Sequence, residues 1–264
     1  MDAFAAKDKR IKVFHTPNQG AAAARNFALS QIQDEEWISF VDADDYIAPS
    51  MYATIMNAIG NNKVDYVRLF CQHTPLRYDG RKFDDSQQPA VKVRIVNQEE
   101  YFLKENVGGF ICSLFLNRHI LQAHPLLFPT KMKILEDQAF SISCATYSNC
   151  FLIMEEPRNY FYYSNNANSL TKQSRDNSND IIRCLNIVYR QFSECCSEKI
   201  MDNYFYAKYL PNKLDSLYSH LIRSRGKTLT ERLDFRIKVR FFSLPRRTQV
   251  KYLLAKLSCM WCRK

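Results

Sequence analysis

Hydrophobic and polar positions alternate regularly over the first seventy residues of the chain. Short apolar runs with the length and composition of strands occur at 11–14, 37–41 and 64–70. Segments rich in helix-forming residues lie between them, at 21–31 and 49–59. Strands that alternate with helices predict an α/β fold with a mainly parallel sheet, in which ligands bind at the carboxyl ends of the strands.

The rest of the chain predicts shorter elements and then a helical end. Helices are expected at 98–104, 117–123 and 136–147, strands at 151–154 and 160–163, and a polar surface excursion at 71–89. Apolar residues at helical spacing recur at 181–192, 201–223 and 228–242. We therefore expect an α/β domain over residues 1–171 and a helical region over residues 172–264.

Charge is distributed unevenly along the chain. The net charge is +10, yet residues 223–264 alone contain 13 Lys or Arg and 2 Asp or Glu, so the preceding body is close to neutral. A localised basic segment is typical of attachment to an anionic lipid surface, whereas nucleic-acid binding along the whole chain predicts an evenly basic body. We therefore expect no nucleic-acid partner.

The basic segment contains a candidate amphipathic helix at 245–257. Its apolar stripe consists of Val250, Leu253, Leu254 and Leu257, and Lys and Arg lie mostly on the other faces. Such a helix can lie on an anionic membrane, or it can pack on the domain through the same stripe. Vesicle binding by a chain cut before Arg223 would separate these interpretations.

Other counts narrow the possible chemistry. Only 6 Gly are present and no glycine-rich nucleotide motif occurs, so we do not expect a glycine-rich phosphate loop. The 9 Cys are irregularly spaced, and the pair Cys259 and Cys262 has no second C-x-x-C to complete a zinc site, which predicts reduced thiols in the cytoplasm. No apolar run reaches the roughly 18 residues that a membrane span needs.

Three carboxylates follow the apolar run at 37–41, in the order Asp42-Ala43-Asp44-Asp45. Clustered carboxylates repel one another unless a cation or a nucleotide partner compensates, and oxygen-only ligands suit Mg²⁺ or Mn²⁺. The alternative is that Asp44 or Asp45 caps the helix that follows. Spacing alone leaves both interpretations open.

The surrounding motifs form an ordered series. Asn18-Gln19-Gly20 and Ala24-Arg25-Asn26 precede the apolar strand, and the acidic turn continues into Tyr46-Ile47. Phe128-Pro129, residues 134–140 (ILEDQAF), Tyr162-Tyr163 and residues 168–171 (NSLT) follow in that order. Over residues 11–171 this series resembles the family-2 glycosyltransferases of the GT-A fold, a Rossmann-like α/β fold.

The resemblance implies a role for each matching residue. Asp42 would contact the nucleoside or ribose of a nucleotide-sugar donor, and Arg25 would face the donor pocket. Asp44 would bind the divalent metal, Mn²⁺ or Mg²⁺, that bridges the donor diphosphate. Asp137 would be the base that takes the proton from the acceptor hydroxyl, which gives inversion in one displacement. From the residues alone, Glu136 and Asp137 are better explained as first-turn acids of a helix.

The resemblance also implies a substrate class and a location. The donor would be a UDP-sugar, the acceptor a saccharide or a lipid-linked sugar, and the pathway the synthesis of a bacterial surface polysaccharide. A lipid-linked acceptor would suit a cytoplasmic enzyme held peripherally on the inner face of the plasma membrane through residues 223–264.

The chain departs from the family pattern at its start. Members open with a V-S-I-I-[IV]-P-x-Y-N strand and a second strand that ends in an acidic turn, and neither occurs here. We therefore expect at least one βαβ unit, roughly thirty residues, to be missing and one sheet edge to be unpaired. An inactive remnant or a basic membrane-surface interaction module is the alternative function. The substitution Asp137→Asn discriminates, because a binding module would be indifferent to it.

Overall fold

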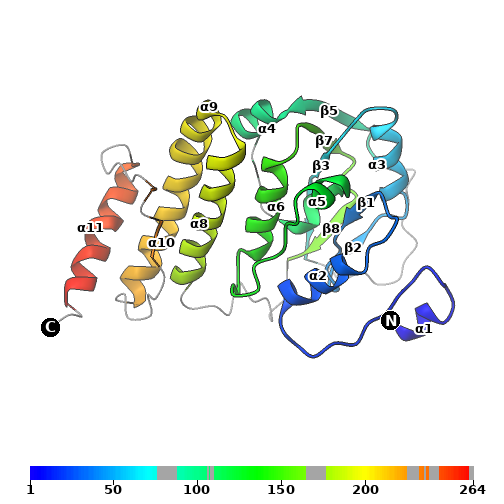
Figure 1. Ribbon diagram of the computed structural model, residues 1–264, viewed down its shortest axis with the longest axis horizontal. Coiled ribbons are helices and arrows are strands. Elements are labelled where there is room, and N and C mark those ends of the chain that lie inside the picture. Colours follow the sequence, from blue (N-terminus) through cyan, green and yellow to red (C-terminus); the bar gives the residue numbers. More distant parts are fainter. Residues whose placement is uncertain are drawn as a thin grey trace.

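Strands and helices alternate along the first part of the chain, and helices alone follow. The computed structural model describes residues 1–75, 88–105, 107, 110–164, 177–224, 232–234, 236–237 and 244–261, with side chains described as far as residue 255. Figure 1 shows the strands at one end of the molecule, a row of C-terminal helices at the other, and helix α6 between them.

The described strands form two sheets. The larger has the order β1-β6-β3-β7-β5, with β1 at Trp37–Ser39, β6 at Leu114–Asn117, β3 at Tyr66–Leu69, β7 at Cys150–Glu156 and β5 at Lys92–Asn97. The smaller has the order β2-β8-β4, with β2 at Tyr46–Ile47, β8 at Tyr160–Tyr163 and β4 at Cys71–Thr74.

Helices flank these sheets and make up the C-terminal region. Those of the first part are α1 (Asp2–Ala5), α2 (Ala21–Ser30), α3 (Met51–Ile59), α4 (Gln98–Lys104), the 3₁₀ turn η2 (Ile111–Ser113), α5 (His119–Ala123) and α6 (Glu136–Thr146). Those of the C-terminal region are α8 (Ser178–Cys195), α9 (Glu198–Ile200), the π-helix η3 (Met201–Tyr209), α10 (Leu210–Ser224) and α11 (Arg246–Trp261). The mixed α/β architecture with a helical end is as the sequence predicts.

The expectation of a mainly parallel sheet is corrected by the strand directions. In the larger sheet, β6 runs antiparallel to both β1 and β3, and β5 runs antiparallel to β7. Of its described pairs, only β3 and β7 are parallel. β1 and β3 still point the same way, as a unit joined through α3 requires, but β6 has inserted between them. The local sequence pattern predicts the unit of β1, α3 and β3. It does not show that β6, a strand distant in the chain, pairs between β1 and β3.

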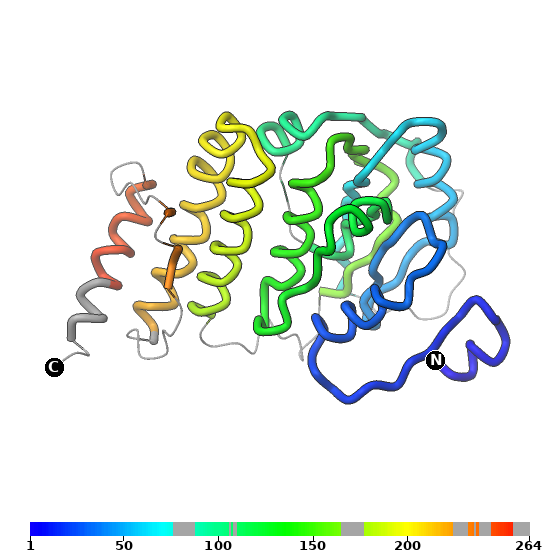
Figure 2. The backbone as a smooth tube through the Cα atoms, in the orientation of Figure 1, coloured from blue at the N-terminus to red at the C-terminus, as the bar shows by residue number. Residues whose placement is uncertain are grey.

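Two segments near the sheets differ from the sequence-based expectation. Residues 11–14 form no strand and lie in an extended segment that loops away from the body (Figure 2). A strand needs a neighbour for its ladder, and β1 stands at an edge of the larger sheet with β6 as its described partner. Within the expected surface excursion, Cys71–Thr74 forms β4 and pairs with β8, while residues 76–87 lie outside the described part of the chain.

The hydrophobic core continues from the larger sheet into the C-terminal helices. Tyr66 of β3 packs on Tyr101 of α4 and on Phe151 of β7, with ring centroids 5.7 and 5.4 Å apart. Phe192 of α8 then packs on Phe102 of α4 at 4.9 Å. All five side chains are buried, so α8 is joined to the α/β part through a common apolar core rather than attached at its surface.

The helical end largely follows the sequence-based expectation. Helices expected at 181–192 and 201–223 are confirmed as α8 and as the continuous pair η3 and α10. The helix expected at 228–242 falls mostly outside the described residues, and residues 232–234 within that range form no helix. None of the helices in the described part of the chain is both long and apolar enough to cross a membrane.

Candidate active site at the carboxyl end of strand β1

The acidic turn after β1 is fastened to strand β8. The Asp45 N–H donates to the Asp42 carbonyl over 3.0 Å, which closes the turn. The Tyr160 hydroxyl donates to Asp45 Oδ2 over 2.7 Å, and the Tyr163 N–H donates to Asp45 Oδ1 over 2.8 Å. Burial raises the pKa of the Asp45 carboxyl. Asp45 therefore anchors the turn, whereas the N-cap residue of α3 is Ser50.

Arg25 joins this turn to two other parts of the chain. It lies on α2, and its Nη2 pairs with Asp42 Oδ1 at 2.9 Å while its Nη1 pairs with Glu136 Oε1 at 3.3 Å. The guanidinium also lies over the Phe128 ring, 5.5 Å from its centroid. The Arg25 side chain is only 17% exposed, so these ion pairs are shielded from solvent more than a surface pair would be. The interaction brings the first turn of α6 to the acidic turn.

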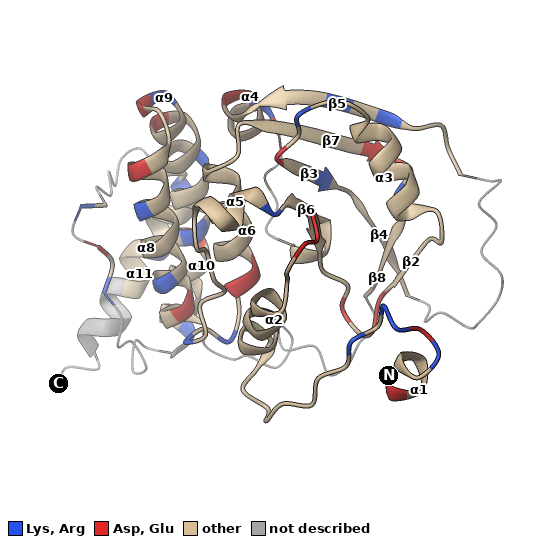
Figure 3. Cartoon of the chain, turned by 45° about the vertical axis from the view of Figure 1, so that its right-hand side comes forward, with Lys and Arg blue, Asp and Glu red and all other residues tan. Residues whose placement is uncertain are grey.

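Asp137 lies beside Glu136 in that first turn of α6, where Figure 3 shows acidic colouring at the start of the helix. Its Oδ1 accepts from the Gln138 N–H at 2.7 Å. Burial raises the pKa of Asp137 to about 6, and the neighbouring Glu136 charge acts in the same direction. The Arg25 charge opposes this shift without cancelling it. A carboxyl with such a pKa is suited to accept a proton near neutral pH.

The structure thus gathers the residues that the sequence singles out, although they are far apart in the chain. Arg25 pairs with both Asp42 and Glu136, and Asp137 is the next residue after Glu136. Asp44 is half-buried in the same acidic turn as Asp42. Carboxylates from two segments therefore share the Arg25 guanidinium, an arrangement that holds the acidic turn next to the first turn of α6.

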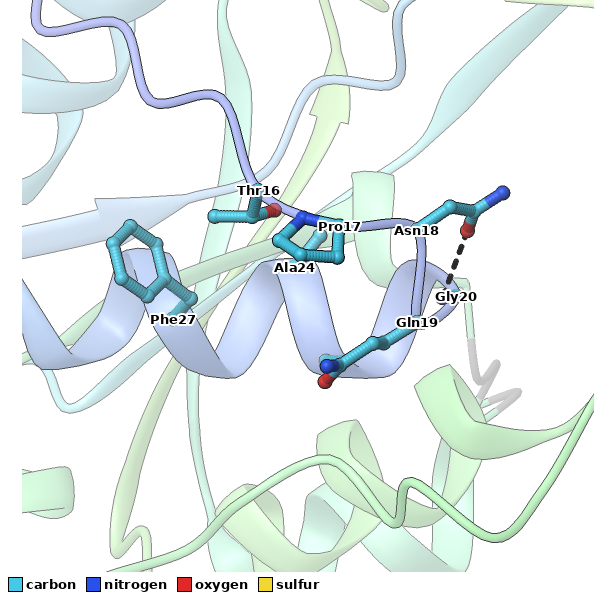
Figure 4. A pocket seen from close by; sticks show the side chains of 8 residues that line it. Thr16, Pro17, Asn18, Gln19, Gly20, Ala24 and Phe27 are labelled. Carbon is cyan, nitrogen blue, oxygen red and sulfur yellow. Dashed lines mark hydrogen bonds between the residues drawn. The ribbon is translucent and has the colours of Figure 1, made fainter.

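The Asn18-Gln19-Gly20 motif occupies a separate hollow in front of α2. Asn18 Oδ1 accepts from the Gly20 N–H at 3.1 Å, and Gly20 adopts φ 88°, a conformation that favours glycine, where the chain enters the helix. Figure 4 shows the side chains that line a hollow of about 280 Å³ there. They belong to Thr16, Pro17, Asn18, Gln19, Gly20, Ala23, Ala24 and Phe27. The carboxylates of the acidic turn do not line this hollow.

The acidic turn offers carboxylate oxygens as possible metal ligands. Among the described residues, no three His, Cys, Asp or Glu side chains converge into a preformed metal site. Mg²⁺ or Mn²⁺ that binds together with a substrate diphosphate needs only one or two carboxylates, because phosphate oxygens and water complete the shell. Asp44, with Asp42 two residues before it, supplies that kind of donor set. The residues present therefore fit such a metal.

The site also contains residues for which the sequence predicts no role. Tyr160, which holds the acidic turn, carries no local signal because its partners are more than a hundred residues away. The C-terminal helices also reach the site: the Tyr209 hydroxyl lies 3.4 Å from Gln138 Oε1, and Lys213 Nζ lies 5.6 Å from the centre of the Tyr209 ring. Burial lowers the pKa of Lys213, and the Asp137 charge opposes that effect.

Helix α11 presents a second surface of interest. Val250, Leu253 and Leu254 are 55, 51 and 47% exposed. The helix packs on α10 through its other side, where Lys251 Nζ pairs with Asp215 Oδ2 at 2.7 Å and Tyr252 contacts Tyr218 at 5.3 Å. The described part of the apolar stripe therefore faces outward, which is contrary to the interpretation that the stripe packs on the domain.

Part of this chain matches a known sequence family, and several known proteins are similar to it. Residues 1–125 match the sequence family described as Glycosyl transferase family 2. The glycosyltransferase EpsJ of Bacillus subtilis is 25% identical over 173 residues, which cover 64% of this chain and 49% of EpsJ. The minor teichoic acid biosynthesis protein GgaA of the same organism is 22% identical over 213 residues, 80% of this chain and 44% of GgaA. The chain thus spans about half the length of these curated relatives.

A solved structure shows the same fold. The crystal structure of S. aureus TarS residues 1–349 in complex with UDP-GlcNAc superposes with a TM-score of 0.58. The alignment covers 93% of this chain and 70% of that one, at 17% sequence identity. At this identity the likeness concerns the fold alone.

Proposed function

We propose that the chain is a family-2 glycosyltransferase, because residues 1–125 match that family and the fold is that of TarS. We propose further that it is an inverting enzyme that uses a UDP-sugar. The acceptor is a saccharide or a lipid-linked sugar in the synthesis of a bacterial surface polysaccharide. The observation that carries the proposal is the Arg25 bridge, which joins Asp42 of the acidic turn to Glu136, the neighbour of Asp137.

The donor half of the proposed site is the acidic turn. Asp42 binds the nucleoside or ribose part of the donor, and its ion pair with Arg25 fixes the carboxylate in place. Asp44 would hold Mn²⁺ or Mg²⁺ against the donor diphosphate. When bound, such a cation neutralises the negative charge that develops on the departing nucleoside diphosphate.

Asp137 is the proposed base of the acceptor half. As the acceptor oxygen attacks the anomeric carbon, its proton passes to the Asp137 carboxylate, and the bond from that carbon to the diphosphate oxygen breaks with its electron pair. The single displacement inverts the anomeric configuration. Positioning of the two substrates and stabilisation of the leaving charge supply most of the rate.

The proposal predicts how the transfer rate depends on pH. Because the pKa of Asp137 is about 6, the base is mostly ionised above that pH and mostly protonated below it. We expect kcat to be level above about pH 7 and to fall about tenfold per pH unit well below 6. Initial rates of UDP release from a panel of UDP-sugars with Mn²⁺ and candidate acceptors test this, and a rate unchanged from pH 8 to pH 5 would contradict the assignment.

We propose a peripheral location on the cytoplasmic side of the membrane; the exposed stripe of α11 supports contact with a membrane surface. Apolar side chains beside a basic surface bind anionic bilayers by burying the stripe and by attracting lipid headgroups. We expect the full chain to sediment with phosphatidylglycerol vesicles and not with phosphatidylcholine vesicles. The double variant Val250→Asp, Leu253→Asp should lose this binding, because charge enters the stripe.

A matched control separates this effect from a general loss of exposed apolar surface. Val91 is 53% exposed and lies far from α11 in the chain, so Val91→Asp should leave sedimentation unchanged. Full binding by the α11 double variant would show that α11 is not the anchor. This test does not depend on whether the protein transfers a sugar.

A further inference from the structure

The segment that leads into α6 is held by helix α8. Asp180, in the first turn of α8, accepts from the backbone N–H of Lys133 at 2.9 Å and of Ile134 at 3.3 Å, both through Oδ2. Its other oxygen, Oδ1, accepts from Arg183 Nη1 at 3.2 Å. Asp180 is only 8% exposed. A buried carboxylate that satisfies two backbone donors of another segment joins α8 firmly to that segment.

The same segment is held at a second point. The Arg183 guanidinium, which pairs with Asp180, also donates to the backbone carbonyl of Lys131. The Asp180–Arg183 pair therefore contacts backbone groups of residues 131, 133 and 134. Its partners lie within six residues of Asp137.

The backbone between this contact and the candidate base is strained. Leu135 has φ 66° and is the one non-glycine residue with positive φ among those that the structure describes. The left-handed conformation is unfavourable for a residue with a Cβ atom, and such residues persist where surrounding contacts hold them. Helix α6 begins at the next residue, so the conformation of Leu135 sets the direction of its first turn.

We propose that Asp180 is a positioning residue, whose contacts with residues 133 and 134 keep Leu135 left-handed and thereby aim Asp137 into the site. This inference rests on the proposed function, because it gives Asp137 the role of the base. It assigns a role in the reaction to the C-terminal helical region, which lies beyond residues 1–125 that match the family. Asp180 touches no reacting atom and acts through the backbone.

The substitution Asp180→Asn tests the proposal with little change of volume. The amide has one oxygen and one NH₂ group, so an N–H donor must then face either the backbone N–H groups or Arg183. We expect kcat to fall at least about tenfold while the dissociation constant of the donor changes less than about twofold, because the acidic turn is untouched. Amides 133 and 134 should exchange with deuterium faster.

A measurement on Asp137 itself makes the test independent of turnover. The carboxyl carbon of Asp137, followed by NMR as a function of pH, should titrate near pH 6 in the unsubstituted protein. In Asp180→Asn the midpoint should move toward the ordinary value of about 4, because a first turn that is no longer held is better solvated. An unchanged midpoint together with unchanged amide exchange would overturn the proposal, whether or not the protein transfers a sugar.

Two further variants separate positioning from general stability. Leu135→Gly removes the cost of positive φ, so the double variant Asp180→Asn, Leu135→Gly should recover most of the lost rate and of the titration midpoint. No recovery would contradict the link through Leu135. Asp234→Asn is the matched control, because Asp234 also accepts from a backbone N–H and pairs with an arginine, Arg236, away from α6. It should alter neither kcat nor the Asp137 titration.

Discussion

Replacing Asp137 by Asn is expected to lower kcat by about 10²–10⁴-fold while donor binding is retained. The amide preserves the shape of the side chain and cannot accept the acceptor proton, whereas the donor contacts belong to the acidic turn on the other side of Arg25. The measurement is the initial rate of transfer beside the dissociation constant of the donor. Loss of both together would indicate a structural role, and an unchanged rate would favour a non-catalytic binding module.

The same substitution is expected to stabilise the fold at alkaline pH. Since burial in the folded protein raises the pKa of the Asp137 carboxyl from its ordinary value of 3.8 to about 6, the ionised carboxylate is disfavoured in the native state. The protonated Asp137 carboxyl makes a favourable contribution to the free energy of unfolding below about pH 4. This contribution is lost as the pH rises through about 6. At pH 8, Asp137→Asn should therefore increase the free energy of unfolding by about 1–3 kcal/mol and raise Tm by several degrees.

A matched variant controls for the general effect of removing an acidic side chain from the first turn of a helix. Asp202 is an exposed first-turn acid of η3, so it has the role that a purely structural interpretation would give Asp137. Asp202→Asn should change neither kcat nor Tm appreciably. A loss of stability in Asp137→Asn at pH 8 would contradict the burial that raises its pKa.

Replacing Asp44 by Ala is expected to abolish the metal-dependent part of donor binding. The proposed site supplies few carboxylates to the cation, and removing one of them should weaken Mn²⁺-dependent affinity for the donor by at least about tenfold to a hundredfold. Titration of the donor with and without Mn²⁺ measures this. Asp34→Ala, an exposed acidic residue in the loop before β1, is the control and should bind as the unsubstituted protein does.

One outcome would contradict the role proposed for Asp44. If Asp44→Ala kept its Mn²⁺-dependent affinity, Asp44 would not be the metal ligand. The turn itself should survive the substitution, because Asp45 still accepts the hydrogen bonds from Tyr160 and Tyr163. Circular dichroism and Tm check that it does.

The residues of the candidate site can be singled out from the sequence because they lie in short motifs with local signatures. Asp42 and Asp44 end an apolar strand, and Asp137 begins a helix, so each is placed by a pattern of a few residues. Their meeting through Arg25 depends on side-chain packing across 111 residues of chain, which no local pattern specifies. The order of the motifs, rather than any one of them, indicated that they share a site.

The parts that sequence could not predict depend on contacts between distant segments. β6 lies between β1 and β3 in the sheet, and neither the length nor the composition of β6 predicts that it pairs with these two strands. Residues 11–14 have the composition of a strand but find no ladder partner among the described strands. Asp180 reads as an ordinary first-turn acid of a helix, and only the folded chain shows that it faces the backbone before α6.

The central claim is that the acidic turn, Arg25 and Asp137 form a nucleotide-sugar site. Isothermal titration of UDP-GlcNAc and a panel of other UDP-sugars into the protein, with and without Mn²⁺, tests it most directly. We expect Mn²⁺-dependent binding of at least one donor with a micromolar dissociation constant, about −8 kcal/mol. Absence of binding by every donor, with the protein folded and Mn²⁺ present, would contradict the account.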